Sequence, residues 1–477
     1  MNSSQWLLDR TASTPEQTAV IFNYQQFSYA DLTQRTMDLL GALQARKGVQ
    51  HIAVIASNSM DTIALIHAFT MSRHQLFLLN TRLSAEEIQW QLDRVHIDLV
   101  IISSQHHNIV STLTDVEIST IDELKHDSDH QPEITAHQQT DVLCTVFTSG
   151  TTGKPKAVPL TFGNFFYSAM ASAYHLGTVA EDVWLLTIPI YHLGGLSIIF
   201  RSCLYGITIL CHDGFDIPQI VRDLNDHRIT LMSLVPAMLR RLLPEIPATN
   251  SLRVVLVGGA ALPVPLHKQA IALSVPVATT YGMTETTSQF ATARPDQAAL
   301  KPGMVGKPLF GSSLQIFQPD ESGIGEIAVK GPTVMTGYLF ADTNRTEDGF
   351  LLTGDIGYVD DDGDLFVLQR RRDLIISGGE NIYPKEVEQA LLAIAAIDDA
   401  CVVGIEDDQW GQVPVAIIQT RDDLTKEQLI KILRSKLAGY KIPRTYYLID
   451  QLPRNTGGKV DRRQVYQMIE DGLPVLS

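Results

Sequence analysis

The side chains best suited to chemistry gather in one polar stretch, residues 148–156, which reads Thr-Ser-Gly-Thr-Thr-Gly-Lys-Pro-Lys. Its glycines let the backbone approach a ligand closely, and its successive N–H groups and hydroxyls can surround phosphate oxygens. The stretch differs from a Walker A loop, because the Gly-x-x-x-x-Gly-Lys-[Ser/Thr] spacing is absent and Pro155 follows Lys154. We therefore predict a flexible triphosphate-binding loop of another kind, and a solvated turn is the alternative.

Two further loops combine glycine with groups that can contact a ligand. Tyr191 and His192 precede Gly194 and Gly195, and such a sequence can form one side of a pocket. A packed histidine at the start of a helix is the alternative. Residues 258–260, Gly-Gly-Ala, follow an apolar run and suit the close approach of a flat ring.

The loop of residues 279–286 adds a carboxylate to hydroxyls and an aromatic ring. It contains Tyr281, Gly282 and Glu285. A carboxylate close to phosphates is repelled unless a divalent cation lies between them. We therefore interpret Glu285 as a Mg²⁺ ligand.

Two more polar side chains follow glycines further along the chain. Asp355 comes directly after Gly354, where it could accept two hydrogen bonds from a ribose diol. A turn-capping aspartate is the alternative. Lys459 stands in a glycine-flanked loop, and without further context it is typical of a surface lysine.

Alternating apolar runs and helical patterns supply the elements that must position these loops. The alternation is regular between residues 142 and 290, which predicts a largely parallel sheet covered by helices on both faces. Ligands bind such sheets at the carboxyl ends of the strands, so each loop that follows a strand is a candidate for the site. The expected strands are residues 142–147, 183–190, 207–211, 230–235, 253–257 and 275–280.

A charged break divides the chain into two predicted domains of an α/β protein. Residues 369–373, Gln-Arg-Arg-Arg-Asp, separate two apolar runs, and Pro384 opens a helical pattern. We predict a large N-terminal domain, residues 1–371, of parallel-rich sheets covered by helices. Residues 372–477 form a predicted small α+β domain of ordinary size.

Composition restricts the partners. An apolar fraction of 45% is typical of a globular protein with cores, and the net charge of −16 argues against nucleic acid or an anionic membrane as a partner. We find no run of about 18 uncharged apolar residues and no signal-peptide pattern, so we expect no membrane span. The four scattered cysteines lack metal-ligand spacing, which predicts reduced, buried thiols in a cytoplasmic protein.

The stretch of residues 148–156 closely resembles the signature loop of the adenylate-forming superfamily, which includes acyl-CoA synthetases, firefly luciferase and the adenylation domains of peptide synthetases. The other loops agree with the superfamily pattern in order and spacing, so the resemblance covers essentially the full chain. It implies two half-reactions. A carboxylate attacks the α-phosphate of ATP to give acyl-AMP and pyrophosphate, and the thiol of coenzyme A then displaces AMP. It also implies a hinge near Arg372 and a mobile C-terminal domain.

The same resemblance implies the roles of individual residues. Lys459 bridges the acyl carboxylate and the α-phosphate during adenylation, and it leaves when the small domain rotates for the thiol step. Gly378 and Gly379 then face the pantetheine arm of coenzyme A. The implied catalytic residues are Lys459, Thr284, Glu285 and His192, with Glu285 on Mg²⁺. The implied ATP-binding residues are Thr148, Ser149, Gly150, Thr151, Thr152, Gly153, Lys154, Gly258, Gly259, Ala260, Thr280, Tyr281, Gly282, Asp355 and Arg370.

The acid is indicated by local sequence. Residues 191–197 and 281–289 are similar to the equivalent stretches of the o-succinylbenzoate–CoA ligases of menaquinone synthesis. That acid has one carboxylate that reacts and a second that needs a cation. Arg201 lies in an apolar run, where a charge is costly unless it is paired, so we predict that it holds the second carboxylate. An arginine that reaches solvent or a structural acid is the alternative. The predicted substrate-binding residues are His192, Arg201, Gly282 and Ser288.

Other functions remain open at this level. The chain could be a CoA ligase for another aryl or medium-chain acid, or a stand-alone adenylation domain that loads a carrier protein. A non-catalytic nucleotide-binding protein is disfavoured by the set Lys154, Glu285, Asp355, Arg370 and Lys459. The sequence leaves the oligomeric state open, including a homo-oligomer.

Overall fold

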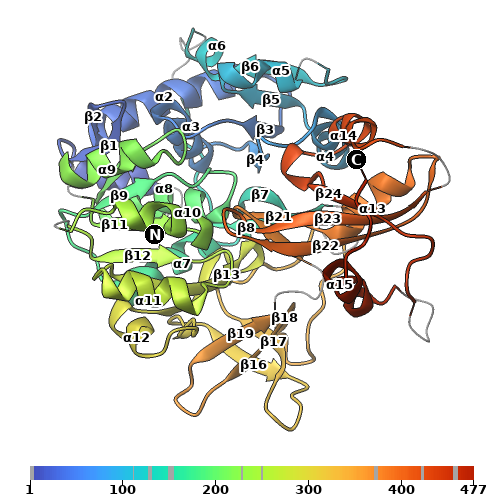
Figure 1. Cartoon of the computed structure of the whole chain (residues 1–477). Helices are drawn as coiled ribbons and strands as arrows, with labels where there is room; N and C mark the ends of the chain where they lie inside the picture. The colour runs from blue at the N-terminus through green and yellow to red at the C-terminus, as the bar shows by residue number, and fades with distance from the viewer. Residues whose placement is uncertain are drawn as a thin grey trace.

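The structure is a computed structural model, drawn as a ribbon in Figure 1. It describes residues 5–110, 112–126, 132–148, 155–226, 229–248, 251–369, 374–420, 424–454 and 460–476. Within these ranges the strands form sheets of six, nine, four and five strands. The class is therefore α/β, with a large N-terminal part and a small C-terminal part, in agreement with the prediction.

The six-stranded sheet has the order β6-β5-β3-β4-β7-β8. All neighbouring strands are parallel except the hairpin of β7 and β8. The inner strands are continuous apolar runs, as expected for a parallel sheet covered on both faces. The strands are β3 (His51–Ile55), β4 (Gln75–Leu78), β5 (Leu99–Ile102), β6 (Glu117–Thr120), β7 (Val142–Thr148) and β8 (Lys156–Thr161).

The nine-stranded sheet has the order β15-β14-β13-β12-β11-β9-β10-β1-β2. Its strands from β13 to β1 are parallel, and the outer strands at both edges are antiparallel. The strands are β1 (Thr18–Phe22), β2 (Gln25–Ser28), β9 (Val183–Leu186), β10 (Thr208–Cys211), β11 (Leu231–Leu234), β12 (Val254–Val257), β13 (Val277–Met283), β14 (Ser288–Ala293) and β15 (Lys307–Pro308).

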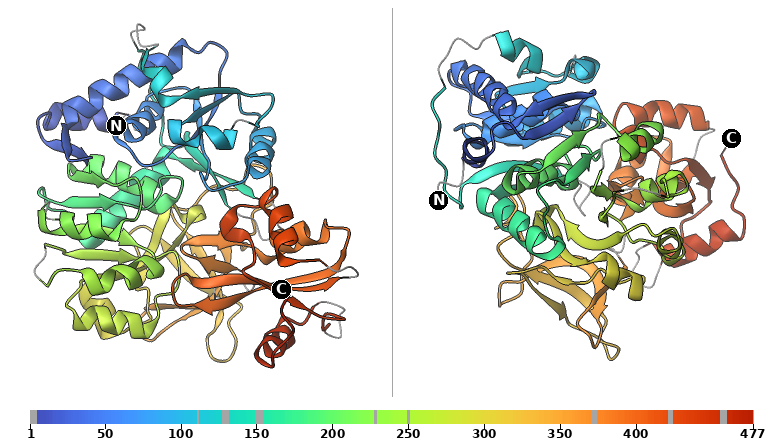
Figure 2. Two further views of the ribbon diagram at one scale, coloured as in Figure 1. Left: turned by 45° about the horizontal axis from the view of Figure 1, so that its top comes forward. Right: turned by 90° about the vertical axis from the view of Figure 1, so that its left-hand side faces the viewer.

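The two large sheets share one hydrophobic core. Helices α3 (Met60–Thr70) and α8 (Leu193–Tyr205) contribute to it together with strands of both sheets. Figure 2 shows these layers side by side, in blue and green. Helix α7 (Phe162–Leu176) begins where β8 ends, at a capping box in which the hydroxyl of Thr161 accepts from the backbone N–H of Asn164 at 3.1 Å.

Two smaller sheets complete the fold. An antiparallel sheet of β16 (Ser313–Phe317), β17 (Gly325–Lys330), β18 (Leu351–Val359) and β19 (Leu365–Gln369) lies at the bottom of Figure 1. The last sheet, with three helices, has its own apolar core, and we call residues 374–476 the small domain. Its elements are β20 (Ile375–Ser377), β21 (Glu380–Ile382), α13 (Pro384–Leu392), β22 (Ile397–Asp407), β23 (Gly411–Thr420), α14 (Lys426–Arg434), β24 (Thr445–Leu448) and α15 (Arg462–Glu470).

A buried lysine connects the small domain to the large one. Lys441 is 2% exposed, and its ammonium group contacts Glu386 of α13 at 2.8 Å and also the carboxylate of Glu87 in α4 (Ala85–Val95). The hydroxyl of Ser84 donates to the carbonyl of Lys436 at 3.2 Å. The two domains therefore meet over a polar, partly charged contact.

Three details differ from the sequence-based expectation. The strand expected at 183–190 ends at Leu186, and it could not have run on to residue 190 because Pro189 has no N–H group for a central ladder. Strand β13 runs on to Met283, so Tyr281 and Gly282 lie in a strand and not in a loop. Strand β7 belongs to the six-stranded sheet, where it pairs with β4, and residues 142–290 therefore span two sheets.

Candidate active site

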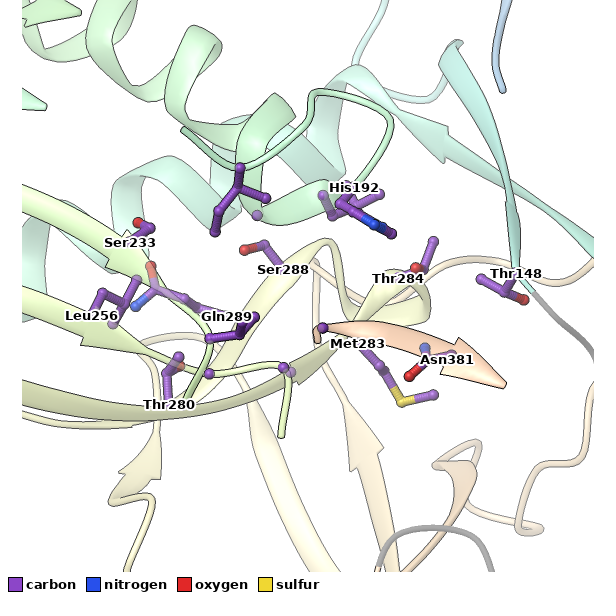
Figure 3. Close-up of a pocket in the computed structure, with 18 of the residues that line it drawn as sticks. Thr148, His192, Ser233, Leu256, Thr280, Met283, Thr284, Ser288, Gln289 and Asn381 are labelled. Carbon is purple, nitrogen blue, oxygen red and sulfur yellow. The ribbon is translucent and has the colours of Figure 1, made fainter. Parts of the chain in front are cut away.

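One pocket collects the loops that follow the parallel strands. It opens at the carboxyl ends of β9, β11, β12 and β13, the position expected for ligands in such sheets. Figure 3 shows Thr148, Thr284 and Asn381 toward one end of it and Ser233, Leu256 and Gln289 toward the other. The predicted site residues that line this pocket are Thr148, His192, Arg201, Gly258, Gly259, Thr280, Gly282, Thr284, Glu285, Ser288, Asp355 and Gly379.

Glycine is required where the pocket wall is tightest. A Cβ atom on Gly282 would lie 1.6 Å from the carbonyl oxygen of Ser288, and one on Gly258 would lie 2.6 Å from the methyl group of Thr280. Gly259 has a φ of +80°, which side chains rarely adopt. The backbone itself therefore forms the wall of the pocket at these three positions.

Glu285 places a carboxylate at the pocket directly after β13. It lies in a short 3₁₀ turn, Thr284–Thr286, and is 3% exposed. The hydroxyl of Tyr338 donates to its Oε1 atom at 2.8 Å. Carboxylate and hydroxyl oxygens are the hard donors that Mg²⁺ prefers, so the pocket-lining residues Thr284 and Glu285 fit a magnesium ion.

The four-stranded sheet brings a second acid to the pocket. Asp355 of β18 is 3% exposed, and it accepts a hydrogen bond from the hydroxyl of Tyr281 at 2.7 Å. The contact joins β13 of the nine-stranded sheet to β18. Asp355 is thereby held in a fixed orientation where it borders the pocket.

A neighbouring cavity lies between the nine-stranded sheet and the small domain. Ala260 and Tyr281 line this cavity and not the first pocket, whereas Gly259, Thr280 and Gly379 line both. Gly378 has a φ of +59°, and a Cβ there would lie 2.7 Å from the ring of Trp410, which also lines the cavity. Gly379 therefore borders both cavities, and the neighbouring Gly378 packs against Trp410.

Arg201 is buried beside the pocket in α8. It is 2% exposed, and its Nη2 atom donates to the hydroxyl of Ser168 at 3.0 Å. Its guanidinium lies 5.9 Å from the ring centre of Trp184. Among the described residues no carboxylate forms an ion pair with it, and its Nε atom has no hydrogen-bond partner. Burial lowers the pKa of this guanidinium, although the Tyr205 side chain opposes the shift.

His192 contacts a carboxylate that the sequence analysis did not identify. Its Nε2 atom lies 3.4 Å from Oε2 of Glu380, which is in β21 of the small domain and 4% exposed. Asn80 and Arg82 of the large domain also donate to Glu380, each at 3.2 Å. Burial alone would raise the pKa of Glu380, but His192 and Arg82 lower it below its usual value. The Gly-Gly-Glu-Asn sequence after β20 is the feature that could have drawn attention to it.

Several predicted residues lie outside the described parts of the chain. The strands that flank the predicted phosphate loop, β7 and β8, end at Thr148 and begin at Lys156. Both of these residues border cavities. The residues outside the described ranges are Ser149, Gly150, Thr151, Thr152, Gly153, Lys154, Arg370 and Lys459, together with the predicted domain boundary at 371–372.

Among the described residues, none of the helices has the length and apolar character of a membrane span. The predicted burial of the cysteines is confirmed. All four thiols are buried and free.

Comparison with known proteins defines the class of this fold and site. Residues 7–339 match the AMP-binding enzyme family, and residues 386–459 match the AMP-binding enzyme C-terminal domain. The chain therefore belongs to the AMP-binding enzyme family.

Its relatives include enzymes of one named activity. The 2-succinylbenzoate–CoA ligase of Bacillus subtilis (strain 168) is 39% identical over 96% of this chain and 97% of its own length. A double mutant of o-succinylbenzoate CoA synthetase (MenE) from Bacillus subtilis, solved with its product analogue OSB-NCoA, has a TM-score of 0.93, with 37% identity over 99% of both chains. The same enzyme in complex with ATP and magnesium ion has a TM-score of 0.74, again with 37% identity, over 97% of this chain and 99% of that one.

Proposed function

We propose that this chain is an AMP-forming 2-succinylbenzoate–CoA ligase of menaquinone biosynthesis. It activates 2-succinylbenzoate with ATP as an acyl-adenylate, releases pyrophosphate, and transfers the acyl group to coenzyme A. The observation that carries the proposal is similarity over almost the whole length to ligases of this name, together with a buried guanidinium beside the pocket.

Adenylation must bring together two anions, the acid and the triphosphate, so it depends on charge neutralisation and positioning. Residues 148–154 hold the β- and γ-phosphates, Thr284 contacts the α-phosphate, and Lys459 bridges it to the acid. Mg²⁺ held by Glu285 would neutralise phosphate charge. The adenosine is held by Gly258, Gly259, Ala260, Thr280, Tyr281, Gly282, Asp355 and Arg370. Most of these adenosine-binding residues border one or both of the two adjoining cavities, and this arrangement supports the assignment.

The thioester step uses a second arrangement of the small domain. The two structures of the Bacillus enzyme have equal identity to this chain, yet the TM-score is 0.93 with the OSB-NCoA complex and 0.74 with the ATP complex. This supports an arrangement suited to thioester formation, with Gly378 and Gly379 beside the pantetheine arm. The two domains, residues 1–371 and 372–477, then rotate relative to each other about a hinge near Arg372. This rotation moves Lys459 into the pocket for adenylation and out of it for the thioester step.

The second carboxylate of the acid is held by Arg201, and His192, Gly282 and Ser288 form the remaining wall. A buried guanidinium without a carboxylate partner among the described residues gains an ion pair when such an acid binds. Free thiols and the proposed substrates ATP and coenzyme A support a cytoplasmic location. Assembly as a homo-oligomer stays a prediction.

Pyrophosphate release with a panel of acids tests this function. We expect release with 2-succinylbenzoate, ATP and Mg²⁺, and formation of the thioester when coenzyme A is added. Stronger release with benzoate or a medium-chain acid would favour a ligase for a different acid. No release of pyrophosphate with any acid of the panel would contradict the proposal.

Lys459→Ala separates the two half-reactions. We expect it to slow acyl-adenylate formation by about 10²–10³-fold, because one charge-stabilising donor is removed. Conversion of supplied acyl-adenylate to the thioester should continue at nearly the rate of the unmodified chain. Equal loss of both steps would contradict the proposed role of the small-domain rotation.

A further inference from the structure

Tyr338 holds the carboxylate of Glu285 from outside the pocket. Its hydroxyl donates to Oε1 of Glu285 at 2.8 Å, and Tyr338 lies between β17 and β18, 53 residues further along the chain. The contact is partly buried, and Glu285 itself is 3% exposed. Hydrogen bonds of this kind fix the orientation of a carboxylate that would otherwise rotate about its last bond.

The segment that carries Tyr338 is itself attached to Glu285. The backbone N–H of Met335 donates to the carbonyl oxygen of Glu285 at 2.9 Å. The backbone N–H of Tyr338 donates to the hydroxyl of Thr343 at 3.1 Å. Glu285 is thus held through its backbone and its side chain by the same short segment.

The same segment also contacts the strand that follows the predicted phosphate loop. The backbone N–H of Leu339 donates to the carbonyl of Ala157 in β8 at 3.1 Å. The ammonium group of Lys156, the first residue of β8, lies 4.6 Å from the centre of the Tyr338 ring. A cation over an aromatic face is attractive, so the ring is oriented from one side by Lys156 and at its hydroxyl by Glu285.

We propose that Tyr338 is a positioning residue that orients the Glu285 carboxylate toward Mg²⁺ and fixes it relative to the base of the phosphate loop. The inference deepens the proposed function, since it rests on Glu285 as the ligand of the Mg²⁺ that accompanies ATP. Partners that orient metal ligands typically change metal affinity or activity by about 10–100-fold when they are removed. Tyr338 acts through Glu285 and needs no contact with substrate.

Calorimetric titration of the full chain with ATP tests this, once with excess Mg²⁺ and once with a chelator. Tyr338→Phe keeps the ring over which Lys156 lies and removes only the hydroxyl. We expect the gain in ATP affinity that Mg²⁺ provides to fall about 10-fold, with unchanged affinity in the chelator. Thioester formation from supplied acyl-adenylate should keep its rate, because that step uses no ATP.

Two further variants decide what the result means. Tyr358→Phe is the matched control, since Tyr358 is a half-buried tyrosine of β18 whose ring stacks on Phe366, and it should behave as the unmodified chain. In a Glu285→Gln background, which should lack the Mg²⁺ gain, Tyr338→Phe should add nothing. Equal weakening of ATP binding with and without Mg²⁺, or a further loss in that background, would overturn the inference. A Mg²⁺ gain that survives Glu285→Gln alone would refute the Glu285 assignment and the inference with it, while leaving pyrophosphate release as the separate test of the ligase function.

Discussion

His192 of the large domain and Glu380 of the small domain are in contact, with 3.4 Å between Nε2 and Oε2. His192 borders the pocket, whereas Glu380 also accepts hydrogen bonds from Asn80 and Arg82. Every one of these donors belongs to the large domain. A single carboxylate of the small domain is therefore satisfied by the large domain, in the arrangement that resembles the OSB-NCoA complex.

Replacement of Glu380 by glutamine should weaken this docking contact. We expect thioester formation from supplied acyl-adenylate to slow about tenfold or more, because a hydrogen-bonded charge pair is lost. Acyl-adenylate formation should change little. Glu427→Gln is a suitable control, since Glu427 is an exposed carboxylate in the first turn of α14 of the small domain. A slower first step with an unchanged second step would contradict this role for Glu380.

The rate of the thioester step should also vary with pH in the acid range. His192 and Arg82 lower the pKa of the docked Glu380 in spite of its burial. Above pH 4.5, the ordinary pKa of a glutamate, the ionised Glu380 stabilises the docked small domain in full. This stabilisation is lost as the pH falls through the lower pKa that Glu380 has in the docked arrangement. The rate of thioester formation from supplied acyl-adenylate, measured between about pH 3 and 6, should decrease as the pH is lowered. Glu380→Gln should flatten that decline.

Arg201→Leu should distinguish acids by their charge. The substitution removes the proposed partner of the second carboxylate, so the KM for 2-succinylbenzoate should rise about 10–100-fold, as expected for hydrogen bonds to a charged group. The KM for a monocarboxylic aryl acid should change little. Comparison of the two acids with one enzyme preparation controls for damage to the fold. Equal losses would show that Arg201 has a structural role.

Gly282→Ala should disturb the pocket through the backbone. The added Cβ would lie 1.6 Å from the carbonyl oxygen of Ser288, which cannot move without distorting the pairing of β13 with β14. We expect the free energy of unfolding to fall by about 1–3 kcal/mol. Gly214→Ala is the control, because a Cβ there meets no atom within 4 Å. Urea unfolding measures both, and equal stability of the two variants would contradict the steric argument.

Lys441→Met should leave one buried and one half-buried carboxylate, Glu386 and Glu87, without their cation. We expect the unfolding free energy to fall by about 3–5 kcal/mol, because removal of one partner leaves buried charge uncompensated. Burial alone would lower the pKa of Lys441, but Glu386 and Glu87 raise it. The charged Lys441 should therefore stabilise the fold in full below pH 10.5, the ordinary pKa of a lysine. This stabilisation should be lost only as the pH rises through the higher pKa of Lys441 in the folded protein. Lys431→Met, at an exposed position of α14, should leave stability nearly unchanged.

Local sequence predicted most of the strands and the edge at which the pocket opens. Apolar runs such as Val254–Val257 define strands, and the parallel order places their following loops together. The assignment of β7 to the other sheet could not be predicted, because strand partners are chosen by packing across the whole domain. Glu380 and Tyr338 were missed for a related reason. Each acts on a residue distant in the sequence. The Gly-Gly pair before Glu380 could have drawn attention to it, whereas no local pattern distinguishes Tyr338 from a surface side chain.

Burial of all four cysteines has a practical consequence; they are Cys144, Cys203, Cys211 and Cys401. Burial raises the pKa of the Cys203 thiol to about 12, although nearby Arg10 opposes it, so at neutral pH this sulfur is almost entirely the unreactive thiol. Cysteines introduced at two exposed positions, one in each domain, would then be the accessible targets for maleimide dyes. Energy transfer between a donor and an acceptor attached in this way would test the proposed rotation of the small domain during turnover.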